Sequence, residues 1–284
     1  MVDFLHIRTL SFVTSFLAIV TFILMLNFYY KRKTYQGFKC WTISSLFISI
    51  GFLLLGLRDF IPAFLSIVIA NSLIIISVIL IIQGIIIFCT SKKSIIVDII
   101  SFIFFIVPFS YFMFLDNLAI RIILVSLFSA FFFLRAAVIV KINLKRVLEK
   151  VDNILFLTFV IIGLWFFCRA ILKIFQYPDN ISNLMNEGII TQFTFIIYDF
   201  YLVFIFAGFI IVNTQRIEKD LKESQKEVKL LTDFLPICAN CKKIRDDKGF
   251  WIQVEKYISD RSKIKFSHGL CPECIAKLYP ELTE

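Results

Sequence analysis

The residues whose types and spacing could do chemistry are four cysteines near the C-terminal end of the chain. They form two pairs, Cys238-Ala-Asn-Cys241 and Cys271-Pro-Glu-Cys274, separated by 29 residues. Two C-x-x-C pairs on the cytoplasmic side of a membrane, where thiols stay reduced, indicate a metal site rather than disulfide bonds. We therefore predict a structural Zn²⁺ site with all four thiolates as ligands, although a rubredoxin-like iron site uses the same ligand set.

A histidine, His268, stands three residues before Cys271 and is a fifth candidate ligand. Because four cysteines already complete a tetrahedral shell, we expect His268 to lie behind the ligands and to donate to a backbone carbonyl or shield the metal. A zinc ion with four cysteine ligands has no open coordination position for a substrate, and the sequence contains no other group of residues typical of a catalytic site. The chain is therefore not expected to be an enzyme. The alternative is a membrane-anchored enzyme or redox sensor that uses Cys271 or His268 as a reactive group.

The residues around the cysteines predict a small α+β module over 233–284. Asp246-Asp247-Lys248-Gly249 is a turn signal between two short strands, and the stretch 251–261 has one apolar helical face. A C-x-x-C knuckle, a hairpin and a second C-x-x-C at the start of a helix make a treble-clef-like arrangement. About 50 residues are too few for a large core, so the metal is expected to supply much of the folding free energy.

The rest of the chain has the composition of a membrane protein. Of its 284 residues 59% are hydrophobic and 18% charged, whereas soluble domains have about 45–50% apolar and 25% charged residues. The segments long enough to cross about 30 Å of hydrocarbon are 9–29, 38–57, 63–88, 95–115, 118–140, 154–175 and 189–212. These seven segments predict an all-α domain of seven transmembrane helices over 1–212. Its partner on the outer faces of the helices is membrane lipid.

The basic residues of the loops predict the orientation. Those after the first, third and fifth spans contain Lys31-Arg32-Lys33, Lys92-Lys93 and Lys145-Arg146, whereas the loops between them are poor in Lys and Arg. By the positive-inside rule the N-terminus is outside and the C-terminal tail is cytoplasmic. The first 212 residues hold 16 of the 30 basic but 9 of the 21 acidic residues, so orientation explains most of the +9 net charge and no nucleic-acid partner is expected.

Ionisable and polar residues within the spans are candidates for a binding site, because charge at membrane depth is costly and usually faces the bundle interior. Arg169, Asp199 and Asn71 could line an outward-facing ligand pocket. The alternative is that Arg169 and Asp199 form a structural ion pair between the last two spans, with Arg121 and Lys173 extending to the interface. Arg135 and Gln83 are further polar residues in spans.

The segment 213–232 after the last span is helical in pattern and polar. Four apolar residues and one serine follow the 4-3-4-3 spacing of a coiled-coil seam. They are Ile217, Leu221, Ser224, Val228 and Leu231. This pattern favours a parallel homodimer that passes motion to the cysteine module. The alternative is a solvated amphipathic helix lying on the bilayer or on the tail.

Two stretches resemble known families. The tail from Leu230 to Leu282, with LPICANCKKIRDD and SHGLCPEC, resembles a short four-cysteine module that bacterial signalling proteins carry after PAS or response-regulator receiver domains and in sensor-kinase-like chains. The stretches 51–76 and 207–221, with Arg169-Ala170, resemble the seven-helix input region of bacterial diguanylate cyclases. No GGDEF signature follows, so cyclase activity is not implied.

Together these features predict a bacterial inner-membrane sensor or signalling adaptor. A cue would alter helix packing in the seven-helix domain, the coiled-coil connector would relay the change, and the zinc module would bind an unidentified cytoplasmic signalling protein. Lys242, Lys243, Arg245 and Asp246 are candidate contacts for that protein.

Overall fold

The computed structural model describes residues 6–90, 95–148, 153–176, 184–186, 188–232, 236–246, 248–261, 265–267 and 269–279. Within these ranges seven helices are long and apolar enough to cross a membrane, as the sequence predicts. Their bounds are α1 Ile7–Lys31, α2 Phe38–Gly56, η1 Phe64–Ile69 continued by α3 Ala70–Thr90, α4 Ile96–Phe114, α5 Leu118–Val147, α6 Ile154–Phe175 and α7 Ile189–Thr232. The chain is a helical, multi-pass membrane protein.

The helices pack into one bundle because each has a buried face and a face rich in exposed Leu, Ile, Val and Phe. A helix satisfies its own backbone hydrogen bonds, so these apolar outer faces are stable in hydrocarbon. The closest neighbours are α5 with α6, α2 with α3 and α1 with α2. By contrast α4 has the smallest buried share of the seven, and its buried residues are Asp98, Phe105 and Phe109.

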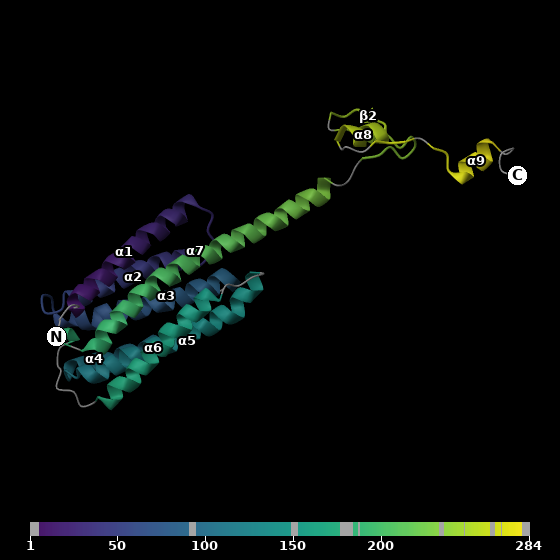
Figure 1. Ribbon diagram of the computed structural model, residues 1–284. Coiled ribbons are helices and arrows are strands. Elements are labelled where there is room, and N and C mark those ends of the chain that lie inside the picture. The colour runs from purple at the N-terminus through teal and green to yellow at the C-terminus, as the bar shows by residue number, and fades with distance from the viewer. Residues whose placement is uncertain are drawn as a thin grey trace. The chain divides into compact units, whose positions relative to one another are not determined.

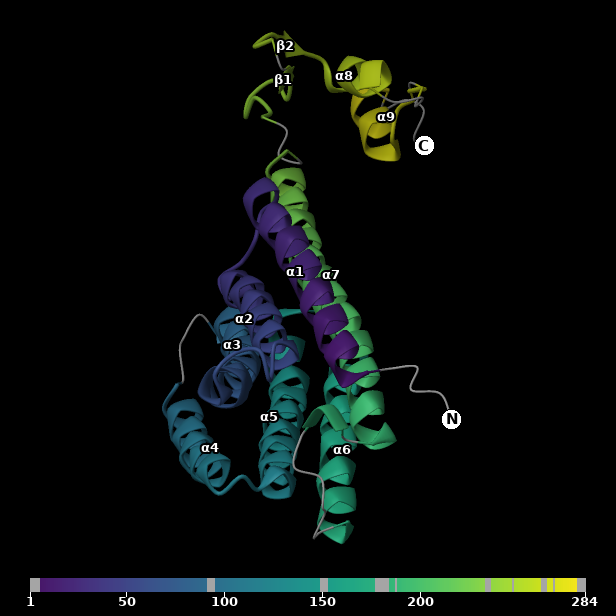
Figure 2. The ribbon, with the colours of Figure 1, turned by 90° about the vertical axis from the view of Figure 1, so that its left-hand side faces the viewer.

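The helix α7 lies against several others in the bundle (Figures 1 and 2). Its aromatic side chains contact α2 through Trp41 and Phe209, whose rings stack at 4.1 Å between centroids. Phe133 of α5 and Tyr201 meet edge to face at 5.1 Å. A displacement of α7 therefore has to disturb packing in several other helices.

A pair of glycines lets α2 approach α3 closely. Gly37 precedes α2 at φ +101°, and a Cβ there would lie 2.3 Å from the carbonyl oxygen of Gly84. A Cβ on Gly84 would lie 2.3 Å from Nε1 of Trp41, which donates to the carbonyl of Ile81 at 3.2 Å. Only glycine has room at these two positions.

The third span begins with the π-helix η1 in place of regular α-helix. The wider hydrogen-bonding pattern of such a turn changes which backbone groups find partners. Here the side chain of Asn71 donates to the carbonyl of Ile67 at 2.7 Å. The π-turn thus positions both Ile67 and Asn71 on the inner side of the bundle.

The packing divides the chain into one unit of residues 1–220 and a second of residues 221–284. In the second unit β1 (Ile244–Arg245) pairs antiparallel with β2 (Trp251–Ile252), and α8 (Val254–Arg261) and α9 (Pro272–Leu278) follow. The hairpin turn has the predicted position: Oδ1 of Asp246 accepts from the N–H groups of Lys248 and Phe250 at 3.0 and 2.7 Å.

Candidate functional site

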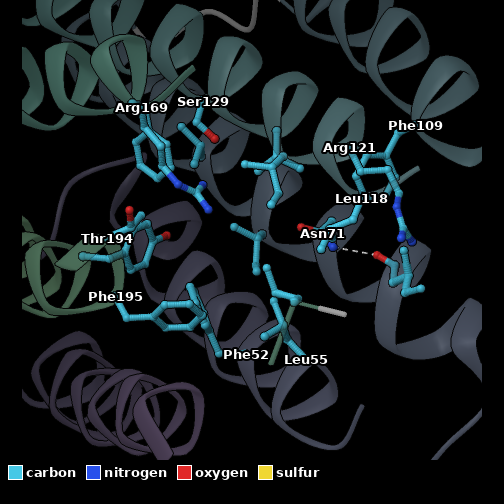
Figure 3. A pocket seen from close by; sticks show the side chains of 18 of the residues that line it. Phe52, Leu55, Asn71, Phe109, Leu118, Arg121, Ser129, Arg169, Thr194 and Phe195 are labelled. Carbon is cyan, nitrogen blue, oxygen red and sulfur yellow. Dashed lines mark hydrogen bonds between the residues drawn. The ribbon is translucent and has the colours of Figure 1, made fainter. Parts of the chain in front are cut away.

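A cavity lies inside the bundle at the end where the chain passes between α2 and η1, between α4 and α5, and between α6 and α7. This is the end opposite to the segment between α1 and α2. The cavity has a volume of about 100 Å³. Its lining residues include Phe52, Leu55, Arg58, Asn71, Val78, Phe109, Arg121, Val125, Phe133, Arg169, Thr194, Phe195 and Tyr198 (Figure 3).

Three of the lining side chains are arginines, and all three are buried. Arg58 follows α2 and is 8% exposed, Arg121 is in the first turn of α5 and is 4% exposed, and Arg169 in α6 is 7% exposed. Burial, together with the nearby charge of Arg121, lowers the pKa of Arg58 to about 10. Arg58 is therefore still a cation at neutral pH.

The sequence prediction placed Arg169 and Asn71 in one pocket, and both line this cavity. Arg169 donates to Ser126 at 3.2 Å and to Thr191 at 3.4 Å. Asp199 instead accepts from Oγ1 of Thr14 in α1 at 2.6 Å. The structure thus gives the two residues of the expected ion pair different partners, and Asp199 is not among the residues that line the cavity.

Two further arginines are functional candidates: Arg58, which the sequence did not single out, and Arg121, which it indicated only as one of the charged residues within the spans. Arg58 reads as an ordinary loop residue, and Arg121 reads as a side chain that extends to the membrane interface. In the structure both are buried against the cavity. The one sequence feature that could have indicated these two arginines is their position: each is near the end of a span and has one acidic residue nearby, Asp59 or Asp116.

A second polar cluster that the sequence analysis missed joins α3, α4 and α5. Asp98, in the first turn of α4, is fully buried and accepts hydrogen bonds from Gln83 of α3 and from Arg135 of α5. Arg135 and Asp98 also form an ion pair. Asp98 escaped notice because it lies only a few residues inside the predicted span, where a carboxylate normally reaches water.

At the opposite end of the bundle, the segment between α1 and α2 holds the part of α7 that follows the last span. Asn213 accepts from the backbone N–H of Tyr35 at 3.2 Å and donates to the carbonyl of Lys33 at 3.1 Å. Tyr35 donates to Asp220, and Arg216 lies over the Tyr35 ring at 4.1 Å. Burial and the hydrogen bond to Asp220 raise the pKa of Tyr35 to about 12, so its hydroxyl keeps its proton at neutral pH.

The first cysteine pair lies in a tight turn in which backbone N–H groups point at one of the two sulfurs. The N–H groups of Cys241 and Asn240 point at the Cys238 sulfur and lower the pKa of that thiol. Lys242 has φ +59°, and its N–H donates to the carbonyl of Cys238 at 3.0 Å. Donors aimed at sulfur stabilise a thiolate, which is the form that binds a metal.

The second pair is arranged in a similar way at the start of α9. The N–H of Cys274 and its thiol, with the N–H of Glu273, lower the pKa of Cys271. Each pair on its own therefore fits half of a tetrathiolate site. Among the described residues, however, no group of three or more Cys, His, Asp or Glu lies close enough together to hold a metal. His268 lies outside the described residues.

The connector is part of α7, and its predicted seam is described in part. Leu221 is exposed on this helix at 56%. Ile217 and Ser224 also lie on the helix, while the side chains of Val228 and Leu231 lie outside the described residues. In a coiled-coil dimer, the partner helix would cover an exposed leucine at a seam position. The homodimer stays a prediction.

Comparison with known proteins adds no assignment. No protein-family model, no curated protein and no solved structure matches this chain. The two resemblances therefore stay predictions.

Proposed function

We propose that this protein is a membrane sensor or signalling adaptor that relays an external or membrane-borne cue to a zinc-stabilised cytoplasmic module. The observation that carries the proposal is the continuity of α7. Its first turns supply Thr194, Phe195 and Tyr198 to the cavity, and the same helix continues without a break to Thr232. Its 44 residues span about 66 Å, roughly twice the hydrocarbon thickness.

A continuous helix couples its two ends because it transmits rotation and displacement with little loss. A change in the cavity that shifts Phe195 or Tyr198 has to move the helix against Phe52, which contacts both rings. Cores change between discrete packings and do not deform gradually, so a small shift favours a second arrangement. The contacts that such a shift would strain or release are those of Tyr35 and Lys33 with Asn213 and Asp220 of α7.

The orientation is the second part of the proposal. The basic loops favour an outside N-terminus and a cytoplasmic tail in a bacterial inner membrane, which would open the cavity end of the bundle to the exterior. In that arrangement the cavity meets external or lipid-borne compounds, and the tail meets cytoplasmic proteins. A parallel homodimer through Leu221 and Ser224 would align two tails side by side.

Zinc is the metal that the cysteine pairs support best. Cys238, Cys241, Cys271 and Cys274 would be its ligands, and the N–H groups that point at Cys238 and Cys271 favour the thiolate form that the metal requires. When bound, the metal would supply folding free energy to a small module. The residues of the knuckle and hairpin would then present a surface, with Lys242 and Arg245 exposed on it, to a cytoplasmic partner.

The lowered thiol pKa values and the exposure of Cys241, Cys271 and Cys274 also favour an alternative, a redox sensor in the tail. Metal analysis of the purified full-length protein separates the two functions. One tightly held zinc per chain, with thiols that resist alkylation until a chelator is added, supports the structural site. Labile zinc with thiols that oxidise reversibly supports redox sensing.

The relay itself is tested by changing the phase of the connector. Deleting residues 221–227 removes one heptad and leaves the helix phase within about 20°, whereas deleting Lys222 and Glu223 turns everything downstream by about 200°. A photo-crosslinker at Lys243 reports contact with a cytoplasmic partner in cells of the source organism. The expected result is one discrete crosslinked product that the heptad deletion keeps and the two-residue deletion abolishes.

Two controls complete this experiment. Cys238→Ser should abolish the crosslinked product if the metal holds the binding surface together. Ser224→Cys should form a disulfide-linked dimer in membranes treated with a mild oxidant, whereas Lys226→Cys, on the opposite face of the helix, should not. If both deletions give the same crosslinked product as the unmodified chain, the relay through the helix is wrong.

A further inference from the structure

Two buried arginines at the cavity have hydrogen-bond donors that nothing in the described part of the chain uses. These donors are Nε of Arg58 and Nη1 of Arg121. Both side chains are more than nine-tenths buried, and both line the cavity. A buried cationic donor without an acceptor is costly, because it has lost water and gained nothing in exchange.

The carboxylates near these two arginines balance them only in part. Asp116 is 3.5 Å from Arg121, but its side chain is 78% exposed, so water screens the pair. Asp59 forms its ion pair with Arg8 at 2.9 Å. No acidic residue lines the cavity within the described residues. The charge of Arg121 lowers the pKa of Arg58, and both side chains line the same cavity.

Most of the remaining cavity wall is apolar. Side chains of Leu55, Ile74, Val78, Val125 and Phe133 cover most of it. Polar side chains away from the Arg58–Arg121 pair are those of Asn71, Ser129, Arg169, Thr194 and Tyr198. Figure 3 shows Arg169 and Asn71 reaching into the same space. A compound that fills this space needs an anionic end and an apolar body.

We propose that the cavity binds an organic anion, with its carboxylate or phosphate group held between Arg58 and Arg121 and its apolar body against Val78, Val125 and Phe133. Guanidinium groups bind such anions by paired, charge-assisted hydrogen bonds, and an anion between these two would offer an acceptor to Nε of Arg58 and Nη1 of Arg121. The ligand comes either from the external solution or from the bilayer as an acidic lipid. The inference deepens the proposed sensor function and rests on it for the consequence of binding.

The experiment uses the full chain in nanodiscs of zwitterionic lipid, with hexanoate as the probe and hexanol as its uncharged counterpart. Binding is measured by calorimetry. Hexanoate is expected to bind and hexanol to bind at least tenfold more weakly, since hexanol lacks the charge that the arginines recognise. Arg58→Gln and Arg121→Gln should each weaken hexanoate binding at least tenfold, and the exposed Arg32→Gln should leave it unchanged.

A second arm tests the bilayer as the source. The protein is purified from membranes and extracted with organic solvent, and the bound lipids are identified by mass spectrometry. A stoichiometric acidic lipid in the unmodified chain that is absent from Arg121→Gln also supports the site. Val125→Phe fills the cavity without changing charge, so it should abolish binding in either arm even if an arginine variant fails to fold.

Two results would overturn the inference: no anion bound in either arm, or equal binding of hexanoate and hexanol. The site and the sensor function can fail separately. Hexanoate that binds as expected but leaves Ser224→Cys crosslinking unchanged would refute the sensor function and keep the site. If neither hexanoate nor an acidic lipid binds and the connector deletions behave as described above, the site is refuted and the relay is kept.

Discussion

The buried carboxylate of Asp98 is the most informative position at which to perturb the bundle. The change is Asp98→Asn, which keeps the shape of the side chain and removes its charge. Asp98 is buried and accepts hydrogen bonds from Gln83 and Arg135, so it connects α4 to both α3 and α5. The other buried residues of α4 are Phe105 and Phe109, both farther along the helix.

The size of the effect follows from the burial of the pair. The Asp98 side chain is 1% exposed and that of Arg135 is 19% exposed, so loss of the carboxylate leaves a mostly buried guanidinium without its counter-charge. Removing one partner of a buried ion pair costs about 3–5 kcal/mol, whereas a neutral hydrogen bond between membrane helices contributes about 0.6 kcal/mol. Because the Arg135 side chain is not completely buried and the asparagine keeps one acceptor, we expect a loss of about 2–3 kcal/mol.

The assay is unfolding by SDS titration of the detergent-solubilised full chain, followed by far-UV circular dichroism. Glu218→Gln is the matched control, because it also neutralises a carboxylate but at an exposed position of α7, and it should change the unfolding free energy by less than about 0.5 kcal/mol. The double variant Asp98→Leu/Arg135→Met removes both charges together. It should be more stable than the sum of the two single variants predicts, since no unpaired charge is left.

The outcome that would refute this reasoning is additivity. If Asp98→Leu and Arg135→Met destabilise independently, the two charges do not depend on each other. Stability of Asp98→Asn equal to that of Glu218→Gln would also contradict a buried pair.

Three further predictions concern other parts of the molecule. Gly84→Ala should lower the unfolding free energy by about 1–3 kcal/mol in the same SDS titration, because its Cβ would meet Trp41, whereas Gly188→Ser adds its Cβ in open space and should have little effect. Tyr35→Phe removes the hydrogen bond to Asp220 and should speed amide hydrogen exchange over 213–221 several-fold. The control Tyr30→Phe, at an exposed tyrosine, should leave this exchange unchanged. Equal exchange rates in the two variants would contradict the role of Tyr35. After chelation, iodoacetamide at pH 7 should alkylate Cys238 and Cys271 faster than free cysteine, because their lowered pKa values leave more of each thiol as thiolate, which is lost only as the pH falls through the lowered pKa. Added zinc should suppress the reaction. A rate equal to that of free cysteine would contradict the hydrogen bonding described for the two sulfurs.

The sequence by itself determined the seven helices and the positions of the tail elements. Long apolar runs have one stable form in hydrocarbon, which is a helix, and their lengths match its thickness. The predicted ends of the spans agree with the helices to within a few residues except for two: α5 continues past residue 140 to Val147, and the polar connector continues α7 to Thr232. The turn at Asp246–Gly249 was also predictable, because Asp and Gly have specific local roles in such turns.

The tertiary structure alone decided which charged residues meet. Arg58 and Arg121 are 63 positions apart in the chain, and Gln83, Asp98 and Arg135 belong to three helices. Hydrophobicity gives the number of spans but not the rotation of each helix about its axis, and that rotation sets whether an arginine faces lipid, water or a neighbour. The two cysteine pairs illustrate the same division: their local knuckles follow from the sequence, and whether four thiolates gather around one metal depends on how the tail folds between them.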